Sequence, residues 1–319
     1  MVSRSSATSG PPAPLLFVVG GVSMYVGAAL AVGLFGQASP AGVAWVRLAG
    51  AAVVLGVWRL VTAVLGRRND RRTDQRSRPE ATRTNRSGWT LRRVVLAGMF
   101  GVVTGAMNIV FYEAIARLPL GTVVAIEFSG PVLVAALGSR SRRDRLALGL
   151  VVVGVALIAD VRLEGSMLGV LFALAAALAW AGYIVLGTRV SRASGTAGEG
   201  IDGLAIGFGV ATVLFSPLAL TVGRIAASPV LLGSALALGV LSSVVPYVLD
   251  QIVLRRLGRA RFALLLALLP LTATVVGLVG LAQIPAPVEA VGIAAVVGGV
   301  ALRREQPEPD SERRAPSLD

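Results

Sequence analysis

The chain has 319 residues, of which 55% are hydrophobic and 15% charged, and its mean hydropathy of +0.77 exceeds that of an ordinary soluble domain. Its 30 arginines and 17 acidic residues give a net charge of +13, and it contains no lysine, cysteine or histidine. This composition excludes disulfides, thiol nucleophiles, soft-metal sites and histidine proton relays. We therefore expect an integral membrane protein without a metal site or a cofactor.

Apolar runs of about 17–25 residues, the length that crosses a hydrocarbon core of about 30 Å, fill the chain from Leu15 to Leu302. A polar tail (1–14) precedes the first run, which we interpret as a span and not a signal peptide because no small-residue cleavage site is clear. We predict an all-α polytopic membrane protein with ten transmembrane helices, at 15–36, 41–64, 94–116, 119–138, 146–160, 167–188, 203–222, 230–254, 262–282 and 286–302.

The arginines alternate between the two sides of these predicted spans. With the N-terminus inside, 25 of the 30 lie in inside segments, and the outside segments hold Arg117, Arg162 and Arg224. Because positive residues gather on the cytoplasmic side, we predict cytoplasmic N- and C-termini. The high pI of 11.6 therefore reflects membrane orientation, and we expect no nucleic-acid partner.

One long loop and the C-terminal tail stand out between and after the spans. The basic loop at 66–93 and the tail at 305–319 are polar and unpatterned, which predicts disorder on the cytoplasmic side. The loop is either a solvated determinant of topology or, at 67–93, a site for anionic lipid headgroups of the bilayer.

A shift of 139 residues superimposes two parts of the chain. It places Arg117 on Arg256 and Pro131 on Pro270, and, further upstream, Asn108 on Tyr247. We predict two repeats, at 15–160 and 167–304, each with five spans. Because five is odd, the second repeat must be inverted relative to the first, which is typical of transporters that expose a central site alternately to either side.

Three segments carry a resemblance to a known family: SMYVGAALAVGLF (23–35), LPLGTVVAIEFSGP (118–131) and SSVVPYVLDQIVLRRL (242–257), with LAWAGYIVLG (178–187) as a fourth. They resemble EamA-domain transporters of the drug/metabolite transporter superfamily, most of all bacterial threonine/homoserine exporters. The resemblance implies ten spans, cytoplasmic termini, a bacterial inner (cell) membrane and export of small amino acids or related metabolites. The chain departs from the family at Leu269 and Gln283, where members often carry carboxylates.

Charged residues inside the spans are the first candidates for function, because burial in lipid is costly. Glu127 lies about 12 Å into span four at about 1.5 Å per residue, close to the midplane. It would be a proton-coupling group, a counter-ion for a substrate ammonium, or a charge held by a fixed partner. Arg47, inside span two, would bind a substrate carboxylate or pair with Glu127 or Glu113.

Further polar and aromatic side chains fall on spans three, six and eight. As cavity-lining candidates we take Asn108, Tyr112, Trp180, Tyr183, Tyr247 and Gln251. Glu113 and Asp250 are gate or ion-pair candidates near the ends of their spans. Pro131, Pro270 and Pro246 are hinge candidates because proline frees a backbone carbonyl.

No phosphate-binding loop or hydrolase motif is present, so ATP-driven pumping and enzymatic activity are not expected. The sequence predicts a secondary active transporter that exports a small amino acid, similar to threonine or homoserine, by alternating access, with proton coupling as one version of the mechanism. An uncoupled facilitator or channel, or an exporter of other amphipathic metabolites or drugs, is the alternative.

Overall fold

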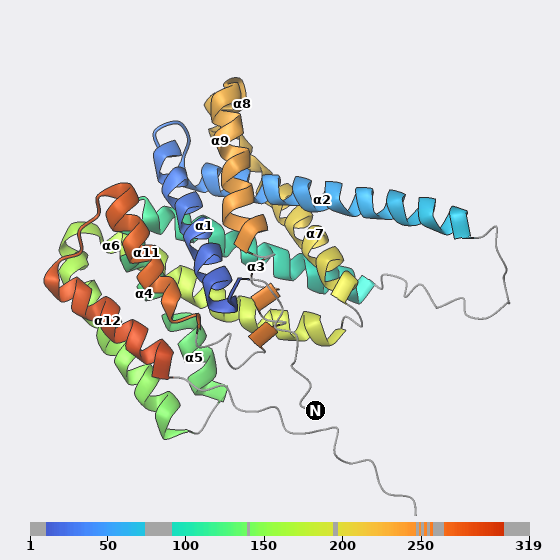
Figure 1. Ribbon diagram of the computed structural model, residues 1–319. Coiled ribbons are helices and arrows are strands. Elements are labelled where there is room, and N and C mark those ends of the chain that lie inside the picture. The colour runs from blue at the N-terminus through green and yellow to red at the C-terminus, as the bar shows by residue number, and fades with distance from the viewer. Residues whose placement is uncertain are drawn as a thin grey trace, which may run out of the picture.

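The computed structural model of the protein describes residues 11–73, 91–138, 141–193, 197–246, 249, 252–253, 256–257 and 265–302 (Figure 1). The predicted disordered tail 305–319, most of the basic loop and most of the N-terminal tail lie outside this range. So do three of the candidate site residues, Tyr247, Asp250 and Gln251.

Helices make up the whole of the regular structure in the described ranges. The first part of the chain forms α1 (Ala13–Leu34), α2 (Pro40–Thr73), α3 (Leu91–Ile115), α4 (Leu120–Glu127), α5 (Ser129–Gly138) and α6 (Arg142–Ala193). The second part forms α7 (Ala197–Leu214), the 3-10 helix η1 (Ser216–Thr221), α8 (Gly223–Ala227), α9 (Pro229–Gly239), the π-helical turn η2 (Val240–Val244), α11 (Leu268–Leu281) and α12 (Pro287–Leu302).

These helices occupy all ten predicted spans. Within the described residues, five segments are long and apolar enough to cross a membrane: Ala13–Leu34, Pro40–Thr62, Val94–Ile115, Leu120–Leu137 and Ser166–Leu186. Shorter apolar helices lie at Ala205–Leu214, Pro229–Val244, Leu268–Leu281 and Pro287–Leu302. The prediction of an all-α polytopic fold is confirmed.

The boundaries differ from the prediction in three places. Spans five and six are two helices that follow each other without a loop, meet at a kink at Ser166 and share the label α6. Span seven ends early, because Pro217 lacks an N–H and the chain tightens into η1 after Leu214. Helix α2 continues to Thr73, nine residues past the predicted end of span two at 64 and into the loop predicted to be disordered. Figure 1 shows the C-terminal end of α2 projecting beyond the other helices.

Glycines allow helices from the two parts of the chain to pack closely. A Cβ atom on Gly101 of α3 would overlap the Gly207 carbonyl of α7. Gly154 of α6 and Gly292 of α12 approach each other in the same way. Small residues at such contacts let helix backbones meet without intervening side chains.

The helix contacts occur in matching sets. Helix α1 packs on α11, and the C-terminal part of α6 packs on α4 and α5. Likewise α2 packs on α9 and α3 packs on α7, while the N-terminal part of α6 packs on α12. If each span is exchanged with the span five places along, the contact of α1 with α11 becomes the contact of the C-terminal part of α6 with α4 and α5. In the same way the contact of α2 with α9 becomes the contact of α7 with α3. This pattern is what two related halves would produce, and the boundaries of the repeats remain a prediction.

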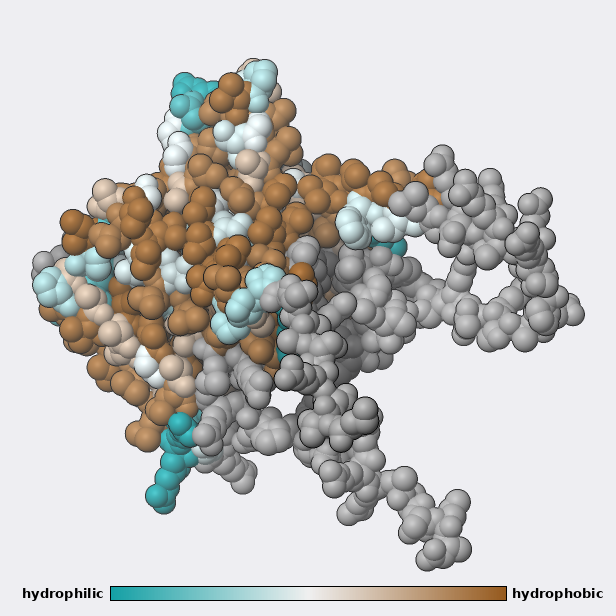
Figure 2. Space-filling view, in the orientation of Figure 1, coloured by the Kyte–Doolittle hydropathy of each residue, from teal (hydrophilic) through white to brown (hydrophobic). Residues whose placement is uncertain are grey.

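Large apolar side chains cover much of the outer surface. Figure 2 shows hydrophobic residues over most of the described part of one face, and exposed examples include Val53, Trp58, Leu60 and Val279. A soluble monomer rarely exposes so wide an apolar surface. The surface suits a lipid environment, and the polar side chains described next lie inside the helix bundle.

Candidate functional site

The site begins at a break in span four. Helix α4 ends at Glu127, and α5 starts at Ser129. Pro131 has no N–H, so the Glu127 carbonyl has lost the partner that an unbroken helix would provide four residues later. The proline therefore explains why the helix is interrupted where the carboxylate lies.

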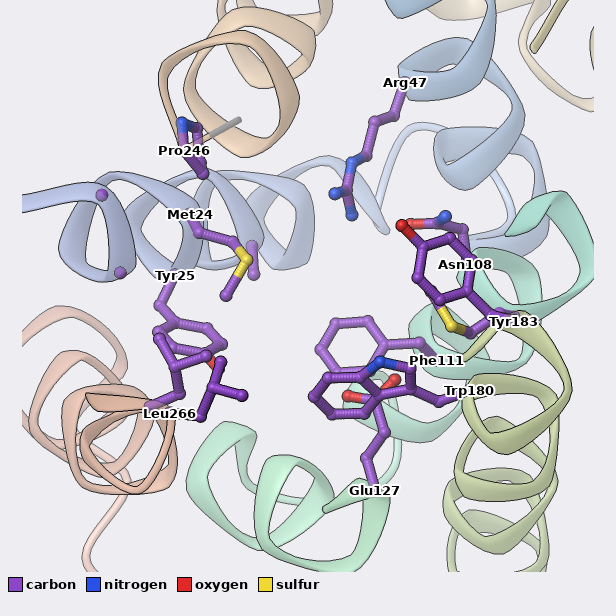
Figure 3. Close-up of a pocket in the computed structure, with 15 residues that line it drawn as sticks. Met24, Tyr25, Arg47, Asn108, Phe111, Glu127, Trp180, Tyr183, Pro246 and Leu266 are labelled. Atoms are coloured by element: carbon purple, nitrogen blue, oxygen red, sulfur yellow. The ribbon is translucent and has the colours of Figure 1, made fainter. Parts of the chain in front are cut away.

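A cavity of about 320 Å³ lies beside this break, between helices from both parts of the chain. Its volume is at the lower end of the range of about 300–1,000 Å³ found for ligand pockets. Figure 3 shows the charged heads of Arg47 and Glu127 approaching it from different sides. The lining residues are Gly20, Gly21, Met24, Tyr25, Ala28, Arg47, Met107, Asn108, Phe111, Glu127, Trp180, Tyr183, Pro246, Leu266 and Leu269.

Glu127 is only 9% exposed and contributes its carboxylate to the cavity wall. Among the described residues it accepts no hydrogen bond and forms no ion pair. Phe128, the next residue, packs edge-on against Trp180 with ring centroids 4.7 Å apart, which holds this stretch against α6. A carboxylate is costly to bury inside a membrane-spanning segment, so Glu127 is the first candidate for a functional group.

Arg47 reaches the cavity from α2, and η2 fixes its position. Its Nη2 donates to the Ser242 carbonyl at 2.8 Å and its Nε to the Ser243 hydroxyl at 3.3 Å. The π-helical turn makes backbone groups available that a regular helix would use internally. A guanidinium has five N–H donors, so Arg47 keeps donors that can bind an anionic group in the cavity.

Asn108 lines the same cavity from α3. Its Nδ2 donates to the Thr104 carbonyl, one turn earlier, at 2.8 Å. Tyr183 and Trp180 of α6 complete this side, and the Tyr183 ring lies 4.6 Å from the Phe100 ring. The structure therefore brings together the charged candidates Glu127 and Arg47 and three of the cavity-lining candidates, Asn108, Trp180 and Tyr183.

Two other predicted residues lie elsewhere. Tyr112 is 0% exposed and does not line the cavity, because its ring is enclosed by Phe35 and Phe111 at centroid distances of 6.1 and 6.0 Å. Its hydroxyl is buried without a hydrogen-bond partner in the described part of the chain. Glu113 pairs with Arg117 at 2.5 Å and accepts from the Ala41 N–H at 3.1 Å, so it is not a partner of Arg47 in this conformation.

Comparison with known proteins identifies the family. Residues 167–303 match the EamA-like transporter family. The chain is 33% identical over 202 residues to the threonine/homoserine exporter RhtA of Escherichia coli (strain K12), covering 62% of this chain and 67% of that protein. It is 32% identical over 219 residues to the protein of the same name from Salmonella typhimurium (strain LT2), covering 65% and 71%. The chain belongs to the EamA-like transporter family.

A solved crystal structure supports the fold. It is 21% identical to the chain, with a TM-score of 0.51, and the match covers 91% of this chain and 95% of that one. Together with the bacterial relatives and the membrane-spanning helices, the family identifies a multi-pass protein of the bacterial inner membrane, and a transporter rather than an enzyme.

Leu269 and Gln283, the two positions expected to depart from the family pattern, have clear structural roles. Leu269 forms part of the cavity wall. The Gln283 Oε1 accepts a hydrogen bond from the Leu120 N–H at 2.8 Å and so caps the first turn of α4. An uncharged amide is sufficient for this cap, because the helix end supplies the N–H donor.

A second buried carboxylate, Glu289, was missed in the sequence. It is 0% exposed, accepts a hydrogen bond from the Thr122 hydroxyl, and accepts another from the Ala286 N–H at 3.2 Å. The second bond closes the first turn of α12, and a glutamate three residues after the N-cap position, Ala286, is a signal that could have revealed it. Glu289 thereby ties α12 to α4, outside the cavity described above.

The apolar part of the cavity wall was also missed. It is lined by Met24 and Tyr25 of α1 and by Leu266, which precedes α11 (Figure 3), together with Leu269 in the first turn of α11. In an apolar span, nothing in the residue type separates a cavity-facing leucine from one that faces lipid. The hinge candidates lie at or near the site. Pro246 lines the cavity two residues after η2, and Pro131 and Pro270 each follow a break in their helix.

Proposed function

We propose that the protein is a secondary active transporter that exports a small amino acid, similar to threonine or homoserine, across the inner membrane by alternating access. The observation that carries the proposal is the pair of opposite charges, Arg47 and Glu127, on the wall of a small and otherwise largely apolar cavity. A zwitterionic amino acid carries the two complementary charges. The names of the RhtA relatives supply the substrate class.

In the proposed complex the substrate carboxylate binds Arg47 and the substrate ammonium binds Glu127. Arg47 offers N–H donors in a planar fork that matches a carboxylate. Glu127 has no competing partner among the described residues, so it is available to a ligand cation. Each charge would offset part of the cost of leaving the other buried.

The position of the cavity supports alternating access. Its wall combines α1, α2, α3 and α4 with Trp180, Tyr183, Pro246, Leu266 and Leu269, which lie in the proposed second repeat (167–304). A site between two inverted repeats opens to one side or the other as the repeats tilt. With the topology inferred from the arginines, both termini are cytoplasmic.

Glu127 would also couple export to a proton gradient. The reason is that Glu127 would be paired with the substrate ammonium in one half of the cycle and protonated in the other. The closed site would then never contain an uncompensated buried charge. The test uses purified protein in proteoliposomes, with radiolabelled threonine and an imposed pH gradient. We expect Glu127→Gln to bind threonine more weakly, measured by isothermal titration, because the ammonium loses its counter-ion, and to lose transport driven by the gradient.

Asp160→Asn serves as the matched control, because Asp160 lies on α6 and does not line the cavity. This variant should transport like the wild type. Undiminished gradient-driven transport by Glu127→Gln would refute proton coupling through this residue. Absence of threonine and homoserine counterflow in the wild type would refute the proposed substrate class.

A further inference from the structure

We infer that Asn108 is a specificity-determining residue, whose side-chain carbonyl accepts a hydrogen bond from the hydroxyl group of the substrate. This inference rests on the proposed function and adds to it the group that distinguishes hydroxylated amino acids from their deoxy analogues. It follows from how the Asn108 amide is held in the cavity wall.

The orientation of the amide is set by a backbone group. The Thr104 carbonyl can only accept a hydrogen bond, so the bond at 2.8 Å requires the NH₂ group of Asn108 to face it. The Asn108 Oδ1 must then point the other way. Among the described residues Oδ1 receives no hydrogen bond, although the side chain is only 8% exposed and lines the cavity.

The cavity therefore offers a fixed neutral acceptor at Asn108 in addition to its two charged groups. Figure 3 places Asn108 on the same side of the cavity as Arg47 and Tyr183, whereas Met24, Tyr25 and Leu266 lie across from it. If the substrate carboxylate and ammonium bind Arg47 and Glu127, the side-chain hydroxyl is the remaining donor that an acceptor can select.

This arrangement discriminates in two directions. A substrate without the hydroxyl leaves the Asn108 carbonyl buried and unpaired, which lowers its affinity relative to the hydroxylated substrate. An acidic side chain would place a carboxylate against a carbonyl oxygen and is rejected by repulsion. Both threonine and homoserine carry a hydroxyl donor, so both satisfy the site.

The experiment compares inhibition of radiolabelled threonine counterflow in proteoliposomes by threonine, homoserine and 2-aminobutyrate, which is threonine without its hydroxyl. We expect the wild type to prefer threonine over 2-aminobutyrate by about three- to tenfold, the discrimination of one neutral hydrogen bond. Asn108→Leu should lose this preference because threonine inhibits more weakly, while 2-aminobutyrate inhibits as before or better.

Thr104→Val is the control. It removes a buried hydroxyl one turn away on α3, which bonds to the Phe100 carbonyl at 2.7 Å, and it leaves the Thr104 carbonyl in place. It should keep the threonine preference. If Asn108→Leu is not monodisperse in detergent, Asn108→Ala makes the same test with a smaller side chain.

Four results would overturn the inference. An unchanged preference in the Asn108 variant would do so, as would an equal loss of affinity for both compounds, which marks a purely structural role. A wild type that exchanges both compounds without preference would refute the role of Asn108 and leave the proposed function intact. A wild type that exchanges no amino acid would refute both.

Discussion

Glu127 and Leu266 occupy equivalent places in two interrupted helices. Each lies four residues before a proline, Pro131 or Pro270, and each contributes to the wall of the same cavity. Glu127 is the last residue of α4, and α5 begins two residues beyond it, whereas Leu266 lies in the turn that precedes α11, which begins two residues beyond Leu266. The prolines thus account for the shared backbone geometry, and the carboxylate is particular to one side of the cavity.

Pro131→Ala tests the role of the break. Alanine would supply an N–H for the Glu127 carbonyl and allow α4 and α5 to join into one helix, which changes the direction of the Glu127 side chain. We expect a maximal counterflow rate at least tenfold lower, with a melting temperature in detergent that is unchanged or higher.

Pro229→Ala is the control for this prediction. Pro229 lies in the first turn of α9, where the missing N–H has no helical acceptor, so its replacement should leave both quantities nearly unchanged. Wild-type counterflow by Pro131→Ala would show that the break does not position Glu127.

Arg47→Lys tests recognition of the substrate carboxylate. An ammonium cannot reproduce the two bonds to Ser242 and Ser243 and still present a planar fork to the ligand. We expect the KM for threonine to rise by about tenfold, equivalent to about 1.4 kcal/mol. Arg59→Gln, further along the same helix and outside the cavity wall, should retain the wild-type KM. An unchanged KM in Arg47→Lys would argue against a contact with the carboxylate.

The polar half of the site could be predicted from the sequence. Glu127, Arg47 and Asn108 stood out because an apolar span tolerates such groups only where lipid does not reach them. Tyr112 was a reasonable candidate, since residues four apart share a face of a helix, and it follows Asn108 by four. However, Phe111 on the same helix and Phe35, directly after α1, enclose the Tyr112 ring. No periodicity argument reveals a neighbour such as Phe35, which comes from another part of the chain.

The remaining features depend on contacts between distant segments. The π-helical turn that offers the Ser242 carbonyl to Arg47 has no distinguishing residue pattern, because serines and valines fit a regular helix equally well. The bond between Thr122 and Glu289 joins residues 167 positions apart. The all-α fold, by contrast, follows directly from the length of the apolar runs, since a backbone in lipid must satisfy its own hydrogen bonds.

Glu289→Ala tests whether this second carboxylate is structural. The substitution would leave the buried Thr122 hydroxyl without its acceptor, at a cost of about 1–3 kcal/mol, and would remove the acceptor of the partly buried Ala286 N–H. We expect a melting temperature several degrees lower in detergent, with the threonine KM of the surviving folded protein unchanged. A normal melting temperature with a raised KM would instead place Glu289 in substrate binding.

Gly101→Ala tests the contact between α3 and α7. The added methyl group would overlap the Gly207 carbonyl, and two helix backbones would have to separate to accommodate it. Asn108, two turns along α3, would shift with the helix, so we expect both a lower melting temperature and weaker threonine counterflow.

The control is Gly56→Ala in α2, where a Cβ atom meets nothing within 4 Å. That variant should be as stable as the wild type or slightly more so, because alanine favours the helix by up to about 1 kcal/mol. Equal melting temperatures for the two variants would contradict the close packing of α3 on α7.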